Sequence, residues 1–243
     1  MSLLRLIARL DIKGPNVVKG INFEGLRVVG KPSDLARKYA EGGADELLYI
    51  DTVATLYGRN QLRSLLAETT EDVFIPVTVG GGIKSRADVR RLLESGADKV
   101  AINTAAIRNP GLIKECADYY GSQCIVVSIE AKRRLEVGWE AFTDNGREKT
   151  GKDAVEWAHE AVELGAGEIL LTSIDQEGTR KGFDVELVKA IAPHVSVPVT
   201  ACGGAGCVEH IREVLGEGKA DAVAMASVLH YGKLTFGEIR KAL

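Results

Sequence analysis

The sequence predicts an α/β fold, a (β/α)8 TIM barrel built from two similar half-barrels. Three observations predict it: the length, an alternation of strand-like and helix-like segments, and an internal repeat that spans half of the chain. Such barrels typically contain about 250 residues in one domain, and this chain has 243. We therefore interpret residues 1–243 as a single barrel domain.

Eight short apolar runs, rich in β-branched residues, predict the strands. Each run is nearly continuous rather than alternating, which is typical of strands buried on both faces of a parallel sheet. The expected strands are Leu4–Ile12, Glu46–Val53, Ile75–Val79, Lys99–Asn103, Cys124–Ile129, Glu168–Ile174, Val197–Ala201 and Ala222–Ser227.

Segments with helical periodicity lie between many of these runs. One begins at Pro32, and another begins at the capping-box-like sequence Ser85–Asp88 and ends at Gly96. Further helices are expected at 109–120, 153–164, 184–191 and 208–216. A doubly wound sheet also alternates strands with helices, but eight regular units favour a closed barrel.

An internal repeat supports closure from two halves. Three motifs recur at offsets of 122 or 123 residues, half of the chain. The pairs are Gly43–Asp51 with Gly165–Ser173, Val79–Ile83 with Cys202–Gly206, and Ala97–Ile102 with Ala220–Met225. A nearly constant offset of this size predicts two similar units of four strands each.

Composition and charge exclude several function classes. The chain has 34 acidic and 31 basic residues and only 5% aromatics, which argues against a general binder of nucleic acids or anionic membranes. Prolines and glycines interrupt the longest uncharged run, residues 190–208, and Arg5 and Arg9 interrupt the N-terminal apolar stretch. We therefore expect neither a membrane span nor a signal peptide.

The four cysteines, Cys116, Cys124, Cys202 and Cys207, lack CxxC spacing. They are interpreted as free thiols of a cytoplasmic protein, with a structural zinc site as the weaker alternative. We predict no metal and no cofactor.

Two glycine-rich turns are candidate phosphate sites. Each follows a predicted strand and precedes a helix, where backbone N–H groups can hold an anion. The residues concerned are Gly82, Asn103 and Thr104 in the first half, and Gly203, Gly204 and Ser227 in the second. Two such sites at one barrel mouth predict a small substrate with phosphates at both ends. The alternative is that these glycines only form tight turns.

Asp11 and Glu130 are candidate catalytic acids. They end strands one and five, at an offset of 119 residues, and these strands are diametrically opposed in an eight-stranded barrel. Catalytic residues of such barrels lie at the C-terminal strand ends, and two carboxylates in different environments can act as acid and base. The alternative is a structural salt bridge to Lys13 or Lys132.

Several motifs together resemble one enzyme family. They are Leu10–Lys13, Val18–Glu24, Thr78–Ile83, Asp98–Ala106, Gly167–Asp175 and Cys202–Gly206. This combination, spread from about residue 4 to residue 231, resembles the cyclase subunit of imidazole glycerol phosphate synthase, from histidine biosynthesis. The resemblance implies a cyclase/lyase that uses ammonia from a glutaminase partner. Ammonia attacks the ketose carbonyl of a doubly phosphorylated formimino-aminoimidazole ribonucleotide, giving imidazole glycerol phosphate and an aminoimidazole carboxamide ribotide.

The resemblance also assigns roles to single residues. It makes Asp11 one of two catalytic acids and places Lys19, Asp51, Gly178 and Thr179 among the substrate contacts. Four alternating charges match a ring at the bottom of the barrel, through which ammonia enters: Arg5, Glu46, Lys99 and Glu168. The glutaminase is therefore expected at the N-terminal face of the barrel.

Three residues depart from the family pattern. Glu130 replaces the second catalytic aspartate, Arg9 replaces a cysteine, and Glu177 replaces an aspartate. One added methylene moves a carboxylate by roughly 1 Å, and misplacement on that scale can cost about 10²-fold in rate. If Arg9 points inward, it needs a buried partner or an anion, and Glu130 across the barrel is one candidate.

These departures keep two further functions open. One is a paralogue that delivers ammonia for amidination of a sugar in surface-polysaccharide synthesis. The other is a barrel that conducts ammonia without chemistry of its own. The presence of Asp11, Lys19 and both glycine-rich turns favours the cyclase.

Overall fold

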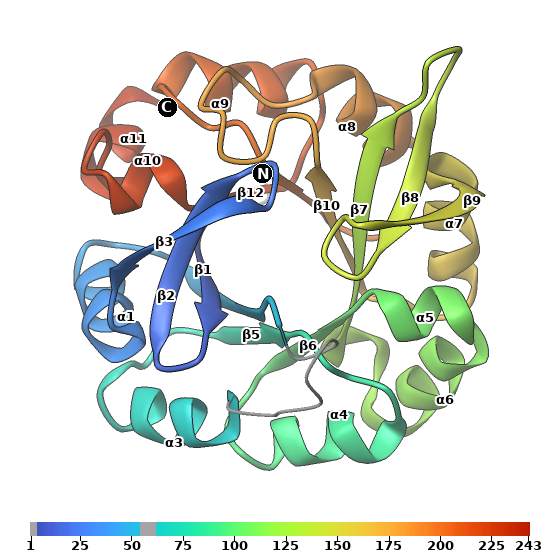
Figure 1. Ribbon diagram of the computed structural model, residues 1–243, viewed down its shortest axis with the longest axis horizontal. Helices are drawn as coiled ribbons and strands as arrows, with labels where there is room; N and C mark the ends of the chain where they lie inside the picture. The colour runs from blue at the N-terminus through green and yellow to red at the C-terminus, as the bar shows by residue number, and fades with distance from the viewer. Residues whose placement is uncertain (1–3, 54–61) are drawn as a thin grey trace.

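The computed structural model describes residues 4–53 and 62–243 and confirms the predicted barrel (Figure 1). Eight parallel strands pair in the order β10-β11-β12-β1-β4-β5-β6-β7, and the pairing of β7 with β10 closes the circle. They are β1 (Arg5–Lys13), β4 (Glu46–Asp51), β5 (Val77–Gly80), β6 (Lys99–Ile102), β7 (Ile125–Arg133), β10 (Glu168–Ser173), β11 (Val199–Cys202) and β12 (Ala222–Met225).

Helices form the outer ring around the strands (Figure 1). They are α1 (Pro32–Glu41), α3 (Leu62–Asp72), α4 (Arg86–Leu93), α5 (Thr104–Arg108), α6 (Gly111–Tyr120), α7 (Ala154–Glu163), α8 (Val185–Ile191), α9 (Val208–Gly216), α10 (Ser227–His230) and α11 (Phe236–Ala242), with short 3-10 turns at Ser122–Cys124 and Ala192–His194. The expected start of α4 is confirmed, because the Ser85 side chain accepts a hydrogen bond from the Asp88 N–H. None of the helices in the described ranges has the length and apolar character needed to cross a membrane.

Side chains of β1 alternate between the two sides of the barrel wall. Leu6 and Leu10 belong to the large core between strands and helices, whereas Ile7 belongs to a separate cluster inside the barrel. Because successive side chains of a strand point to opposite faces, Arg5, Arg9 and Asp11 share the inner face with Ile7. From the bottom upward, β1 therefore lines the interior with a cation, an apolar residue, a second cation and a carboxylate.

Two hairpins extend the barrel, and sequence analysis did not predict their strands. β2 (Asn16–Ile21) pairs antiparallel with β1 and with β3 (Glu24–Gly30), while β8 (Trp139–Thr143) pairs with β7 and with β9 (Glu148–Asp153). Each hairpin follows the first strand of its half-barrel. Phe23 from one hairpin and Phe142 from the other pack together with Ile174, so the two hairpins meet above the mouth.

Candidate active site

Four charged side chains converge at the C-terminal ends of the strands and are almost fully buried. They are Asp11 on β1, Lys19 on β2, Glu130 on β7 and Glu177 in the loop after β10, with exposed fractions of 2%, 3%, 7% and 3%. The sequence predicted the two acids and Lys19 at this mouth. Hairpin β2–β3 is what brings Lys19 back over the end of β1, where Asp11 pairs with Val18 in the strand register.

Asp11 is held by two cations. Its Oδ1 accepts from Arg9 Nε at 2.8 Å and its Oδ2 accepts from Lys19 Nζ at 2.9 Å, while Lys19 also pairs with Glu177. The Glu177 carboxylate in turn accepts from the Phe23 N–H at 3.1 Å. Asp11 is thus in a buried ion pair, as the structural alternative required, but its partners are Arg9 and Lys19 and not the two lysines considered there.

The two acids differ in ionisation. Burial by itself would raise the pKa of Asp11, but the charges of Arg9 and Lys19 outweigh burial and hold that pKa well below its usual range. Burial raises the pKa of Glu130 to about 7, although the charge of Arg9 and the Gly146 N–H, which donates to Oε2 at 2.7 Å, work against it. At neutral pH, Asp11 is a carboxylate and Glu130 carries a proton about half of the time.

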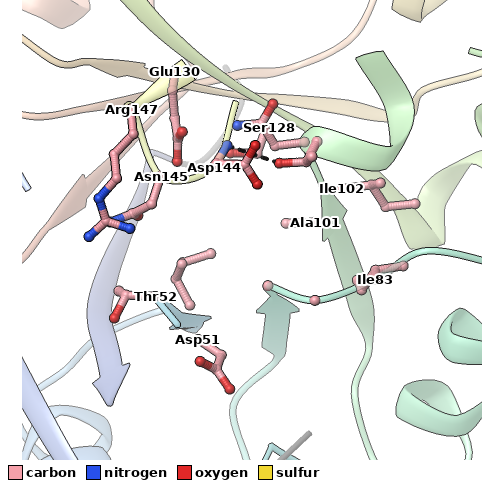
Figure 2. Close-up of a pocket in the computed structure, with 15 residues that line it drawn as sticks. Asp51, Thr52, Ile83, Ala101, Ile102, Ser128, Glu130, Asp144, Asn145 and Arg147 are labelled. Atoms are coloured by element: carbon pink, nitrogen blue, oxygen red, sulfur yellow. Dashed lines mark hydrogen bonds between the residues drawn. The ribbon is translucent and has the colours of Figure 1, made fainter. Parts of the chain in front are cut away.

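The first glycine-rich turn lines a pocket together with predicted site residues. The lining includes Asp51, Gly82, Asn103, Thr104 and Glu130. Figure 2 shows Glu130, Asp144 and Arg147 above the pocket in this view and Asp51 below it.

Hydrogen bonds fix the β8–β9 turn to this pocket. The Asp144 N–H donates to Thr104 Oγ1 at 3.1 Å, and the Asn103 amide donates to the Phe142 carbonyl at 3.2 Å. The turn that follows Phe142 is therefore tied to the residues expected to bind phosphate.

The second glycine-rich turn lines another pocket on the opposite half. Arg9, Lys19, Gly178, Arg180, Gly203, Gly204 and Ser227 line it. Thr179 lies in the same loop as Gly178, where its hydroxyl donates to the Gln176 carbonyl at 2.8 Å. The structure therefore brings the second set of predicted phosphate residues together, apart from the first set.

The two glycine turns repeat one backbone geometry. Gly81 and Gly203 have φ angles of 100° and 93°, in the left-handed region that favours glycine. A Cβ on Gly81 would lie 2.3 Å from the Asp51 carbonyl oxygen, and one on Gly203 would lie 2.8 Å from that of Ser173. Asp51 and Ser173 occupy equivalent places in the sequence repeat, so the same close approach occurs in both halves.

The four charges at the bottom form a closed ring. Each is the first residue of its strand, and the ion pairs run from Arg5 to Glu46 (3.2 Å), from Glu46 to Lys99 (2.8 Å), from Lys99 to Glu168 (2.9 Å) and from Glu168 back to Arg5 (3.0 Å). Burial works to raise the pKa of Glu168, but Lys99 and Arg5 outweigh it and hold that pKa below its ordinary value. The four side chains therefore converge as predicted.

Sequence reasoning missed several residues of the mouth. Arg147 and the Gly146 N–H lie in the β8–β9 turn, and no local pattern predicted that hairpin. Arg180 and Thr172 also belong to the site, and Thr172 accepts from Arg9 Nη1 at 3.2 Å. Within the described ranges, no three or more His, Cys, Asp or Glu residues are grouped so as to hold a metal ion.

The family model described as "Histidine biosynthesis protein" matches residues 5–235. The chain belongs to this family. Among curated proteins, it is 63% identical over 212 residues to "Imidazole glycerol phosphate synthase subunit HisF" of Legionella pneumophila, covering 87% of this chain and all of that protein. It is 50% identical over 242 residues to the protein of the same name from a Nostoc species, covering 98% of this chain and 93% of that one.

Within the histidine biosynthesis family, the departures identified in the sequence are not scattered over this barrel. Arg9 and Glu177 belong to one chain of ion pairs through Asp11 and Lys19, and the charge of Arg9 acts on Glu130. Arg9 contacts Asp11 and not Glu130, so the expected candidate pair across the barrel is not formed. The three changes therefore act on a single electrostatic centre.

Proposed function

We propose that this chain is an ammonia-dependent cyclase/lyase of the imidazole glycerol phosphate synthase type. It converts a doubly phosphorylated formimino-aminoimidazole ribonucleotide to imidazole glycerol phosphate and an aminoimidazole carboxamide ribotide. The observation that carries the proposal is the position of two acids, whose pKa values are shifted in opposite directions, at two glycine-lined pockets. The names of its relatives support the same reaction.

The two pockets hold the ends of the substrate. Backbone N–H groups at Gly82 and Thr104 bind one phosphate, and those at Gly204 and Ser227 bind the other. A substrate held at both ends has its ketose carbonyl fixed between Asp11 and Glu130. Such positioning can supply about 7–11 kcal/mol of the barrier.

Asp11 and Glu130 have different tasks. The Asp11 carboxylate stabilises the positive charge that develops on nitrogen when ammonia attacks the carbonyl. Protonated Glu130 donates a proton to the carbonyl oxygen as ammonia adds, takes a proton from the added nitrogen, and donates it to the resulting hydroxyl group, which leaves as water when the imine forms. Lys19 holds Asp11 in place and contacts the substrate.

Ammonia arrives from a glutaminase subunit docked on the N-terminal face. The ring of Arg5, Glu46, Lys99 and Glu168 closes that end of the barrel interior, and its pairs must separate for ammonia to pass. The four cysteines are free thiols, which fits the reducing cytoplasm as the place of this reaction.

A second candidate function is favoured by Arg9. Its guanidinium group is buried inside the barrel between Asp11 and the strands β10 and β11, where a cyclase substrate needs room. A barrel that passes ammonia to another enzyme, including one that amidinates a sugar in surface-polysaccharide synthesis, needs no such room.

Turnover of the ribonucleotide with ammonium salt, followed by the loss of its absorbance, separates these candidates. The cyclase turns over the ribonucleotide without any partner. A conducting barrel shows no turnover with ammonium salt, yet raises the glutaminase-dependent activity of a third enzyme. Absence of turnover by a folded preparation that binds phosphate would contradict the proposal.

A further inference from the structure

Arg9 is a buried cation inside the barrel for which the proposed reaction has no task. Only 2% of its surface is exposed. Burial alone would lower the pKa of this guanidinium, but Asp11 beside it keeps the pKa above its ordinary value. A permanent charge in this place has to be matched by its neighbours.

The Arg9 side chain spans the barrel interior. It begins on β1, whose partners in the barrel are β12 and β4, yet Nη1 donates to Thr172 Oγ1 on β10 at 3.2 Å and to Cys202 Sγ on β11 at 3.3 Å. The guanidinium carbon lies 5.6 Å from the centre of the Phe23 ring. Contacts on several sides hold the guanidinium group in one orientation.

That orientation directs Arg9 Nε to Asp11. Because Lys19 binds the other oxygen, both oxygens of Asp11 are taken by cations. Adding a proton to Asp11 would break one of these pairs: Lys19 would keep Glu177, but Arg9 has no second salt bridge among the described residues. Breaking a buried ion pair is strongly unfavourable, because it leaves a buried charge without its partner.

Glu130 is placed differently. Its Oε2 accepts the Gly146 N–H, and none of the ion pairs among the described residues includes it. The charged groups that act on it are Arg9 and Asp11 from β1 and Asp144 from the β8–β9 turn. Glu130 can gain or lose a proton without breaking a salt bridge.

We propose that Arg9 is a positioning residue that withdraws Asp11 from proton transfer and leaves Glu130 to move the protons at this mouth. Asp11 then acts only as a fixed negative charge. Glu130 donates a proton to the carbonyl oxygen and afterwards takes one from the nitrogen that attacked. The proton steps rest on the proposed function, whereas the ionisation states do not.

Carboxyl 13C NMR of the full chain without substrate tests the ionisation states directly. Spectra of Asp11→Asn and Glu130→Gln assign the two signals. In the wild type, we expect the Glu130 signal to titrate with a midpoint near pH 7 and the Asp11 signal to stay unchanged between pH 4 and pH 9. An Asp11 signal that titrates between pH 5 and pH 8 would overturn the proposal.

Two variants separate the charge of Arg9 from its contacts. Arg9→Met removes the charge that favours ionised Glu130, so the Glu130 midpoint rises, by about one pH unit. Arg9→Lys keeps the charge, and we expect a Glu130 midpoint within a few tenths of the wild type. A midpoint that moves equally in both variants contradicts the charge effect. If Arg9→Met does not fold, the wild type and Arg9→Lys still test the proposal, because in both of them the Asp11 signal should stay unchanged between pH 4 and pH 9.

The pH dependence of kcat links this centre to the reaction. At constant free ammonia, the plot of log kcat against pH should change slope once, near pH 7. Arg9→Met should move this change of slope in the same direction as the NMR midpoint. A second change of slope that disappears in Asp11→Asn would show that Asp11 moves protons and would overturn the proposal. If the ribonucleotide is not turned over at all, the proposed function fails, while the NMR titration still tests the role of Arg9.

Discussion

The two halves of the barrel mouth share their backbone geometry and differ in charge. Among the charged side chains that line the pocket beside Gly82, three are carboxylates and one is a cation: Asp51, Glu130, Asp144 and Arg147. Beside Gly204 the numbers are reversed, with three cations and one carboxylate: Arg9, Lys19, Arg180 and Glu177. We propose that the repeated glycine turns determine where an anion lies and that the side chains around them determine how strongly it is held.

The same contrast separates the two acids. Asp11 lies against the cations and stays ionised, whereas burial, with a smaller effect of Asp11 and Asp144, raises the pKa of Glu130 to about 7 at the carboxylate-rich pocket. A duplicated half-barrel therefore places two acids with different ionisation at two equivalent strand ends, and we propose that one of them, Glu130, carries the proton. Variants that remove one of these charges should change turnover, stability or phosphate binding by different amounts.

The largest effect is expected for Asp11→Asn. It leaves the shape of the side chain nearly unchanged but removes the carboxylate that Arg9 and Lys19 share, so turnover should fall by about 10³-fold. Binding of inorganic phosphate should persist, because the glycine turns are unchanged. Circular dichroism and thermal unfolding control for folding. Turnover within tenfold of the wild type in a folded variant would refute the role of Asp11.

The next largest effect is the pH dependence of the stability that Glu130 contributes to the folded chain. Burial raises the pKa of Glu130 in the folded chain from about 4.5 to about 7, so the folded state binds more protons than the unfolded state between these values. The Glu130 contribution to stability is complete below about pH 4.5 and is lost as pH rises through 7, by about 3 kcal/mol. Denaturant unfolding at pH 5 and pH 8 measures this loss, which should be smaller in Glu130→Gln. An identical pH dependence in the variant would contradict the assigned burial effect.

Lys99→Ala probes the opposite end of the barrel. It removes the cation between Glu46 and Glu168 and opens the ring. Glutamine-dependent turnover of the complex with the glutaminase should fall on the order of tenfold, the size of a typical coupling between sites. Ammonium-dependent turnover should change little, because Lys99 is far along the barrel from the mouth. Equal loss of both activities would argue against a gate.

The smallest effects are expected for Arg180→Ala and Arg147→Ala, and they concern phosphate binding. Each variant removes one exposed cation. After Arg180→Ala, Arg9 and Lys19 remain beside Gly204, whereas Arg147 is the sole cation among the described residues that line its pocket. Inorganic phosphate binding beside Gly82 should weaken about fivefold in Arg147→Ala, equivalent to about 1 kcal/mol, and binding beside Gly204 should weaken less in Arg180→Ala. Calorimetric titration of both variants measures the difference, and the opposite order would contradict the charge comparison.

Local patterns in the sequence predicted the strands and the residues that lie at their ends. The eight strands and the placement of Asp11 and Glu130 at one mouth follow once the alternation of β and α segments is recognised, whereas the bottom ring was expected only from the family resemblance. Arg147 was missed because its hairpin forms only through pairing of β8 with β7, a contact that no short segment encodes. The pairing of Asp11 with Lys19 was also not predictable, since Lys19 reaches Asp11 only when β2 folds back on β1.

The most direct test is the pH profile of ribonucleotide turnover by wild type and Glu130→Gln, measured at constant free ammonia. We predict that the wild-type kcat is highest below pH 7 and falls above it, as protonated Glu130 is lost. Glu130→Gln should be slower by about 10²–10⁴-fold and should lack this fall. An unchanged profile in Glu130→Gln, or a folded wild type that does not convert the ribonucleotide at any pH, would contradict a cyclase in which Glu130 carries the proton.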